Sequence, residues 1–102
     1  MSFGNLAKMA QKMQADMARA QEELAALQVE GTAGGGAVRA VATGNQELVG
    51  LTIDPDAVDP QDVEMLQDLV LAAVNDALGN ARKIAEQKMA AVTGGLRIPG
   101  LG

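Results

Sequence analysis

The 102-residue sequence contains neither cysteine nor histidine, and each absence excludes a kind of chemistry. Without cysteine the chain can form no disulfide and no thiolate metal site. Without histidine it lacks the commonest general base and the commonest transition-metal ligand. No other pairing of a nucleophile with a base is recognisable. We therefore expect a protein that is not an enzyme and that binds no metal and no cofactor.

Aromatic residues are almost missing, since Phe3 is the only one. Apolar residues make up 48% of the chain, but most of them are Ala, Val, Leu and Met. Aromatic rings bury the most area per residue, so the core of a single chain is predicted to be thin. Small chains with thin cores usually need disulfides, metals or oligomerisation. With no cysteine present, we expect a homodimer.

Long apolar runs are also missing. No segment approaches the roughly 20 residues of a membrane-spanning helix, and the N-terminus lacks the apolar core of a signal peptide. We expect a soluble, intracellular protein with no membrane partner and no small-molecule substrate.

Two apparent ligand loops do not fit their motifs. The glycine-rich run at residues 31–36 is followed by Ala37 and Val38, where a phosphate-binding loop requires Lys and then Ser or Thr. The acids of residues 54–59 resemble the start of a calcium loop, but Met65 stands where the closing Glu is required. The first segment fits a hairpin turn and the second fits helix capping.

The charges that are present are sorted by position. Residues 1–19 carry three bases against one acid, residues 20–80 carry eleven acids against one base, and residues 81–102 carry four bases against one acid. The net charge is −5, yet both ends are basic. Because steering of a charged partner depends on the local field, the two basic ends are compatible with a polyanion as ligand.

The N-terminal segment, residues 4–28, is predicted to form one helix about 37 Å long. Its apolar residues alternate at spacings of four and three, which is typical of a narrow helix–helix seam. They are Leu6, Ala10, Met13, Met17, Ala20, Leu24 and Leu27. The partner of this seam is either another helix of the same chain or a helix of a second copy.

Three short segments rich in Val, Thr and Ile follow, at residues 29–33, 37–43 and 47–53. Glycine clusters and a Gly-Asn pair separate them, which predicts hairpin turns and a three-stranded antiparallel meander. Val49, Leu51 and Ile53 alternate with other residues, so we expect one face of the third strand to be buried.

A second long helix is predicted to begin at Asp59 and Pro60, which suit the N-cap and the first helical position. Apolar residues continue at helical spacing until Gly94 and Gly95 end the helix. The fold class is therefore α/β of the α+β type, with the order α-β-β-β-α. We expect residues 1–93 to form a single domain and residues 94–102 to form a flexible Gly- and Pro-containing tail.

Both predicted helices are too long to fit on a three-stranded sheet. The start of the first helix and the end of the second must project beyond it, and these are the two basic segments. The projection would carry Lys8, Lys12, Arg82, Lys83 and Lys88. Each of these residues alone also fits an ordinary solvated side chain, but their grouping favours a nucleic-acid surface.

Residues 64–77, in the second helix, read EMLQDLVLAAVNDA, and shorter motifs lie at residues 5–14, 53–55 and 88–96. With these motifs the chain resembles the YbaB/EbfC family of bacterial nucleoid-associated proteins over nearly its whole length. The resemblance implies a tweezer-like homodimer that binds double-stranded DNA with low sequence specificity in the cytoplasm and nucleoid. It also implies effects on DNA conformation, nucleoid organisation and gene expression. The family's DNA contacts are attributed to the helical arms, which implies Lys8, Lys12, Arg19, Arg82, Lys83 and Lys88 here.

A second function is compatible with the same features. The narrow helical seam is also suited to recruiting a protein partner, which would make the chain a protein–protein adaptor. Retention on DNA at low salt and release at higher salt distinguish the first function from the second.

Overall fold

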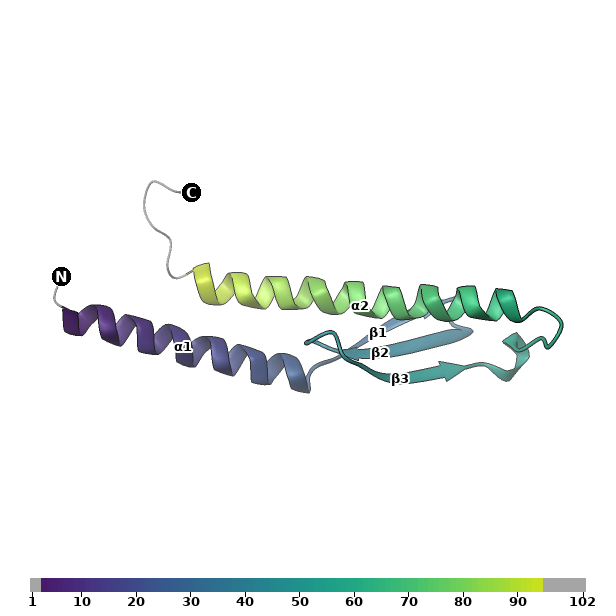
Figure 1. Cartoon of the computed structure of the whole chain (residues 1–102), viewed down its shortest axis with the longest axis horizontal. Coiled ribbons are helices and arrows are strands. Elements are labelled where there is room, and N and C mark those ends of the chain that lie inside the picture. Colours follow the sequence, from purple (N-terminus) through teal and green to yellow (C-terminus); the bar gives the residue numbers. More distant parts are fainter. Residues whose placement is uncertain (1–2, 95–102) are drawn as a thin grey trace.

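The computed structural model describes residues 3–94, and it confirms the predicted order of two long helices around a three-stranded antiparallel sheet (Figure 1). The elements are α1 (Phe3–Ala26), β1 (Gln28–Ala33), β2 (Val38–Thr43), β3 (Leu48–Ile53), a short 3₁₀ helix (Pro55–Ala57) and α2 (Val63–Thr93). The strand order is β1-β2-β3, so β2 is the central strand.

A tight glycine turn joins the first two strands of the sheet. Gly34, Gly35 and Gly36 join β1 to β2 with φ angles of 63°, 68° and 94°. Because residues with a side chain rarely adopt such angles, this turn explains the glycine run. The pairing runs from Gln28 opposite Thr43 to Ala33 opposite Val38.

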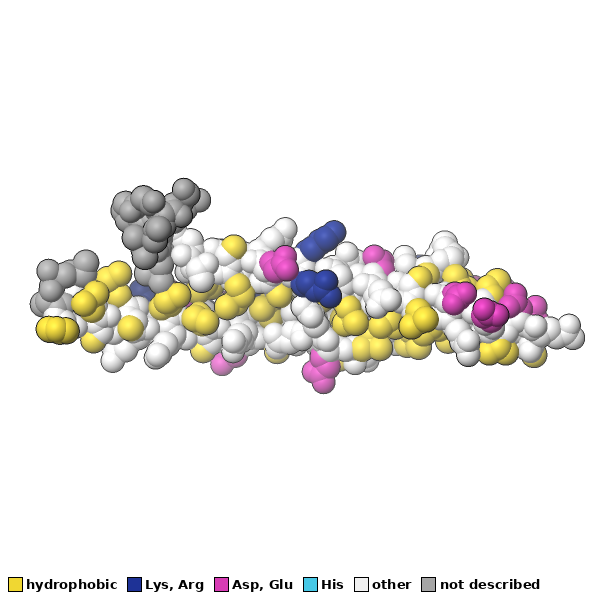
Figure 2. All heavy atoms as spheres, turned by 45° about the horizontal axis from the view of Figure 1, so that its top comes forward, with side chains coloured by type: hydrophobic (Ala, Val, Ile, Leu, Met, Phe, Trp, Pro, Cys, Tyr) yellow, Lys and Arg dark blue, Asp and Glu magenta, His cyan; other side chains and the backbone are white. Residues whose placement is uncertain are grey.

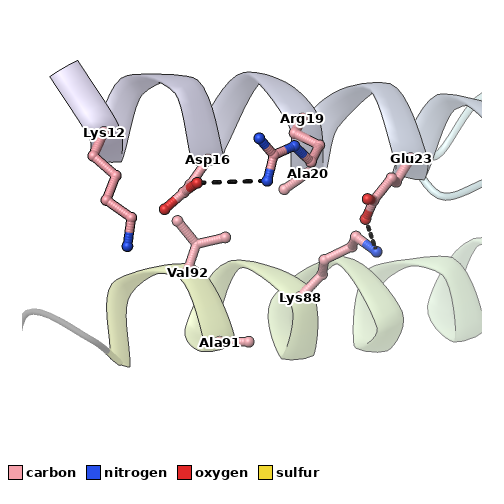
Figure 3. A pocket seen from close by; sticks show the side chains of 8 residues that line it. All are labelled: Lys12, Asp16, Arg19, Ala20, Glu23, Lys88, Ala91 and Val92. Atoms are coloured by element: carbon pink, nitrogen blue, oxygen red, sulfur yellow. Dashed lines mark ion pairs between the residues drawn. The ribbon is translucent and has the colours of Figure 1, made fainter.

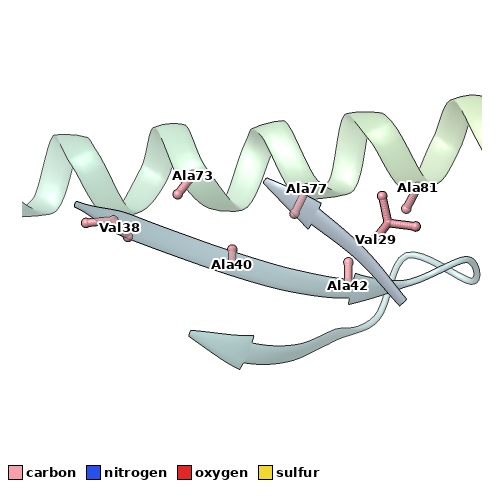
Figure 4. Packing of buried hydrophobic residues seen from close by; sticks show 7 residues of the cluster. All are labelled: Val29, Val38, Ala40, Ala42, Ala73, Ala77 and Ala81. Atoms are coloured by element: carbon pink, nitrogen blue, oxygen red, sulfur yellow. The ribbon is translucent and has the colours of Figure 1, made fainter. Parts of the chain in front are cut away.

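The core lies between α2 and the first two strands (Figure 4). Its buried residues are Val29, Val38, Ala40, Ala42, Ala73, Ala77 and Ala81. Small side chains on both layers let the helix approach closely, and Gly31 of β1 lies directly against the backbone of Ala73 and Ala77. Val38 is the one larger side chain that is fully buried among the described residues, so the core is thin, as the lack of aromatic residues predicted.

Two polar side chains of α2 also bind the free edge of β1. The Thr32 N–H donates to the carboxylate of Asp76 at 3.0 Å, and the Asn80 side-chain amide donates to the Glu30 carbonyl at 3.1 Å.

The predicted burial of one face of β3 is wrong for the single chain. Val49 is 52% exposed and Leu51 is 46% exposed, and only Ile53 is partly buried. The reason is the position of α2, which packs on β1 and β2 and leaves β3 uncovered. Apolar side chains consequently lie exposed beside α2 on the face that Figure 2 shows.

The start of α2 also differs from the prediction. The N-cap is Asp62, whose carboxylate accepts the Met65 N–H at 3.2 Å. Asp59 instead accepts the Gln61 N–H at 2.9 Å in the preceding turn. Both acids precede the helix, but Asp59 is engaged in the turn that contains Pro60, so Asp62 becomes the N-cap. At the other end Gly94 is the C-cap, and the rest of the predicted tail, residues 95–102, lies outside the described residues.

Both helices extend beyond the sheet, as predicted (Figure 1). The radius of gyration is 19.8 Å, whereas a compact chain of this length has about 13 Å. The C-terminal half of α1 packs on α2 of the same chain, where Ala20 and Leu24 are buried. Leu6 and Met9, nearer the start of α1, are exposed. An intramolecular partner therefore accounts for one half of the predicted seam only.

Candidate nucleic-acid interface

All six cations expected to contact DNA lie on the two long helices. Lys8, Lys12 and Arg19 are on α1, and Arg82, Lys83 and Lys88 are on α2. Five of them are exposed, and the Lys88 side chain keeps 35% of its accessible surface. The sheet contributes none of them.

An open groove runs between the projecting parts of α1 and α2 (Figure 3). Lys12, Asp16, Arg19 and Glu23 of α1 line one side, and Lys88 of α2 lies across from them. Small apolar side chains, Ala20, Ala91 and Val92, complete the lining. The groove therefore brings together three of the six cations.

Two of these three cations are already paired with carboxylates. Arg19 Nη1 lies 3.8 Å from Asp16 Oδ1, one helical turn away on α1. Lys88 Nζ pairs with Glu23 Oε2 and so joins the two helices (Figure 3). The hydrogen bond and charge of Lys88, together with the more weakly acting Arg19, lower the pKa of Glu23 against a smaller opposing effect of desolvation. Positive and negative side chains thus alternate along the groove.

The other four cations make no ion pair within residues 3–94: they are Lys8, Lys12, Arg82 and Lys83. Arg82 and Lys83 lie about 8–9 Å before Lys88 along the α2 axis. They stand between Ala81 and Ile84, which pack against the sheet, so the prediction that these two residues lie on the projection is wrong. Figure 2 shows basic side chains at this mid-length position. The exposed cations are therefore distributed along the helices.

The sheet end of the molecule has the opposite charge. Arg39, on β2, pairs with Glu30 of β1 at 3.0 Å, so its charge is neutralised locally. Acidic side chains of residues 54–68 occupy the end remote from the helical projections (Figure 2). A polyanion would be repelled from this end and attracted toward the helices.

Sequence reasoning identified the bases but missed the acids that pair with them. The Asp16–Arg19 pair could have been found, because residues three apart face each other on a helix. The Glu23–Lys88 pair joins residues 65 positions apart in the sequence. It depends on how α1 and α2 are aligned against each other, which local sequence patterns do not specify.

Residues 3–94 contain neither a metal-binding cluster nor a membrane-spanning helix. This part of the chain holds no cluster of three or more acidic side chains placed to bind a metal ion. No helix in the same range combines the length and the apolar character that crossing a membrane requires.

The chain is similar to known proteins over almost its full length. A family model described as the YbaB/EbfC DNA-binding family matches residues 1–96. A nucleoid-associated protein of Pelotomaculum thermopropionicum is 57% identical, with 99% of each chain covered. One from Thermoanaerobacter pseudethanolicus is 56% identical, over 98% of this chain and 90% of that protein.

A solved structure supports the fold. The crystal structure of an uncharacterized protein from Helicobacter pylori matches with a TM-score of 0.74 and 25% identity, covering 95% of this chain and 99% of that one. The two chains therefore share this fold over nearly their full lengths. From the family match and the identity of its relatives, the chain belongs to the YbaB/EbfC DNA-binding family of nucleoid-associated proteins.

Proposed function

We propose that this protein binds double-stranded DNA with low sequence specificity through the basic residues of its two helices, and so affects DNA conformation, nucleoid organisation and gene expression in the bacterial cytoplasm. The observation that carries the proposal is the separation of charge. Four exposed cations without an ion pair in the described chain lie on helices that extend away from an acidic end.

Contacts to phosphate account for the low specificity. Three of the four cations without an ion pair in the described chain are lysines, and lysine is a flexible point charge that suits phosphate oxygens. Phosphate contacts position a protein on the duplex but carry no sequence information directly. Unrelated duplexes of equal length are therefore expected to bind within about tenfold of one another, since each specific base contact would add about 1–3 kcal/mol.

We also propose that the active form is a homodimer. Leu71 of α2 is 61% exposed, and Leu66, Gln67, Val70 and Leu71 line an apolar groove on the helix surface. Leu48, Val49 and Leu51 of the uncovered strand β3 are exposed as well. An exposed apolar surface of this kind, on a chain with a thin core, is what a partner subunit covers.

A second copy is the partner that suits this surface. A two-fold interface uses the same patch on both subunits, so the apolar surface of one chain packs against the same apolar surface of the other. Such a dimer carries two pairs of basic helices. It therefore brings eight of these cations, rather than four, to one duplex.

Salt titration of DNA binding tests the proposal. If a dimer contacts about six phosphates, the plot of log affinity against log salt should have a slope near −5, from about −0.9 per contact. Changing Lys8, Lys12, Arg82 and Lys83 together to Glu should abolish retention on DNA while leaving the melting temperature nearly unchanged, because exposed charges contribute little to stability. Arg39→Glu, on the sheet, is the control.

Three results would contradict the proposal. They are a flat salt response, a preference for one site by several orders of magnitude, and loss of binding in Arg39→Glu while the helix variant still binds. The protein–protein adaptor is the second candidate, and the exposed stripe of Phe3, Leu6 and Met9 at the start of α1 favours it. A wild-type protein that DNA does not retain at low salt would leave the adaptor as the better account.

A further inference from the structure

The cations near the groove are not equally available to DNA. Lys12 makes no ion pair within the described chain, whereas Lys88 is held by Glu23 across the two helices and Arg19 by Asp16 along α1. The two pairs differ in strength. The Asp16–Arg19 separation of 3.8 Å is long, while Lys88 donates a hydrogen bond to Glu23. The pairing of Lys88 should therefore reduce DNA binding more than the pairing of Arg19 does.

We infer that Glu23 competes with DNA phosphate for Lys88 and thereby limits the affinity of the helical arms for DNA. This inference rests on the proposed function and names Glu23 as a residue that limits how strongly the protein binds DNA. Glu23 needs no contact with DNA in this role. It acts by occupying the ammonium group that would otherwise bind a phosphate oxygen.

The physical reason is that counterions leave the DNA when a cation of the protein binds a phosphate. DNA affinity for a basic protein comes largely from counterions that leave the phosphates when Lys or Arg neutralises them. A lysine bound to a carboxylate of its own chain can neutralise a phosphate only after it gives up that carboxylate. It then leaves an unpaired acid beside the duplex, which repels the phosphates.

The geometry makes the competition possible. Both partners keep solvent-accessible surface, 35% for the Lys88 side chain and 51% for Glu23. The pair lines an open groove that also contains Lys12 and Arg19 (Figure 3). Once released, the Lys88 ammonium would join these cations on one surface.

The neighbouring residue Glu22 supplies a matched control. It is also exposed and also on α1, but it has no ion pair in the part of the chain described. Glu22→Gln and Glu23→Gln remove the same charge from adjacent positions, with residues of nearly equal helix propensity. Only Glu23→Gln releases a cation.

The experiment compares the full-length wild type and the two variants on one duplex across salt concentrations. Glu23→Gln frees one lysine per chain and two per dimer, so its salt slope should become steeper by about 1.8. Its affinity relative to wild type should then rise about tenfold as salt is lowered from ~200 to ~50 mM. Glu22→Gln should leave the slope at its wild-type value.

A double variant keeps the inference testable if Glu23→Gln alone disturbs the helices. Glu23→Gln with Lys88→Gln removes the whole pair, and its slope should equal that of wild type, because Lys88 contacts no phosphate there. A double variant with a slope about 1.8 shallower would place Lys88 on DNA in the wild type and overturn the inference. Equal effects of Glu22→Gln and Glu23→Gln, or weaker binding by Glu23→Gln, would also overturn it.

The proposed function is judged separately, from wild type alone. If the wild type shows no salt-dependent binding, the proposed function fails and this inference fails with it. If the wild type binds but the Glu variants do not differ from each other, the inference alone fails.

Discussion

Gly31→Ala should be among the most damaging single changes in this protein. A Cβ at Gly31 would lie 2.1 Å from the Ala77 nitrogen and 2.6 Å from the Ala73 carbonyl oxygen. Both are backbone atoms of α2, which cannot rotate away as a side chain would. The helix must therefore shift off the sheet, at the centre of the only core cluster of the described chain. Overpacking of a core typically costs about 1–3 kcal/mol, and we expect the upper end or more here.

The same substitution at Gly79 supplies the control. Gly79 lies inside α2, and apart from the adjacent turns of its own helix a Cβ there would meet no atom of the described chain within 4 Å. Ala is favoured over Gly in a helix interior by about 1 kcal/mol, so Gly79→Ala should stabilise. Urea unfolding followed by far-ultraviolet circular dichroism, at one fixed protein concentration, measures both signs. A Gly31→Ala variant within 0.5 kcal/mol of wild type would refute the close packing of α2 on β1.

Two further predictions concern the arms and the proposed dimer. The pKa of Glu23 is lowered from its ordinary value of 4.5 by Lys88, so their pair stabilises the fold above that value and is lost as pH falls through the lowered pKa. The melting temperature of Glu23→Gln should thus lie below that of wild type at pH 7 and converge with it as the pH falls through the lowered pKa of Glu23; a constant difference would contradict the pairing. Leu71→Glu should convert the dimer to single chains in sedimentation equilibrium, because it buries a charge in the proposed interface. Ala72→Glu, next to it but not lining the apolar groove, should leave the dimer intact, and an intact dimer with Leu71→Glu would exclude this surface.

The elements of the fold were predictable because their signals are local. Helical spacing of apolar residues, glycine turns and β-branched runs each depend on neighbours within a few positions. The N-cap was misplaced by three residues because Asp59 and Asp62 both carry the preferred side chain, and only the turn at Pro60 decides between them.

What the sequence could not provide was how the helices pack on the sheet and on each other. Alternation in β3 indicates that Leu51 has a buried face in some state, but it does not say whether the cover comes from the same chain. The helix that carries each of the six cations followed from the sequence, but the position of Arg82 and Lys83 beside the sheet did not. The availability of the cations did not follow either, because the Glu23–Lys88 contact depends on how α1 packs on α2.

The polar contacts along β1 bear on how copies of this protein can associate. An edge strand with free backbone groups is a template on which another chain can pair. Asp76 and Asn80 occupy such groups at Thr32 and Glu30, so α2 obstructs the β1 edge with its own side chains. The opposite edge, β3, has no such cover from α2. A sheet that is blocked at one side can add a neighbour only at the other, and this one-sidedness favours a closed pair of chains over an open-ended fibre.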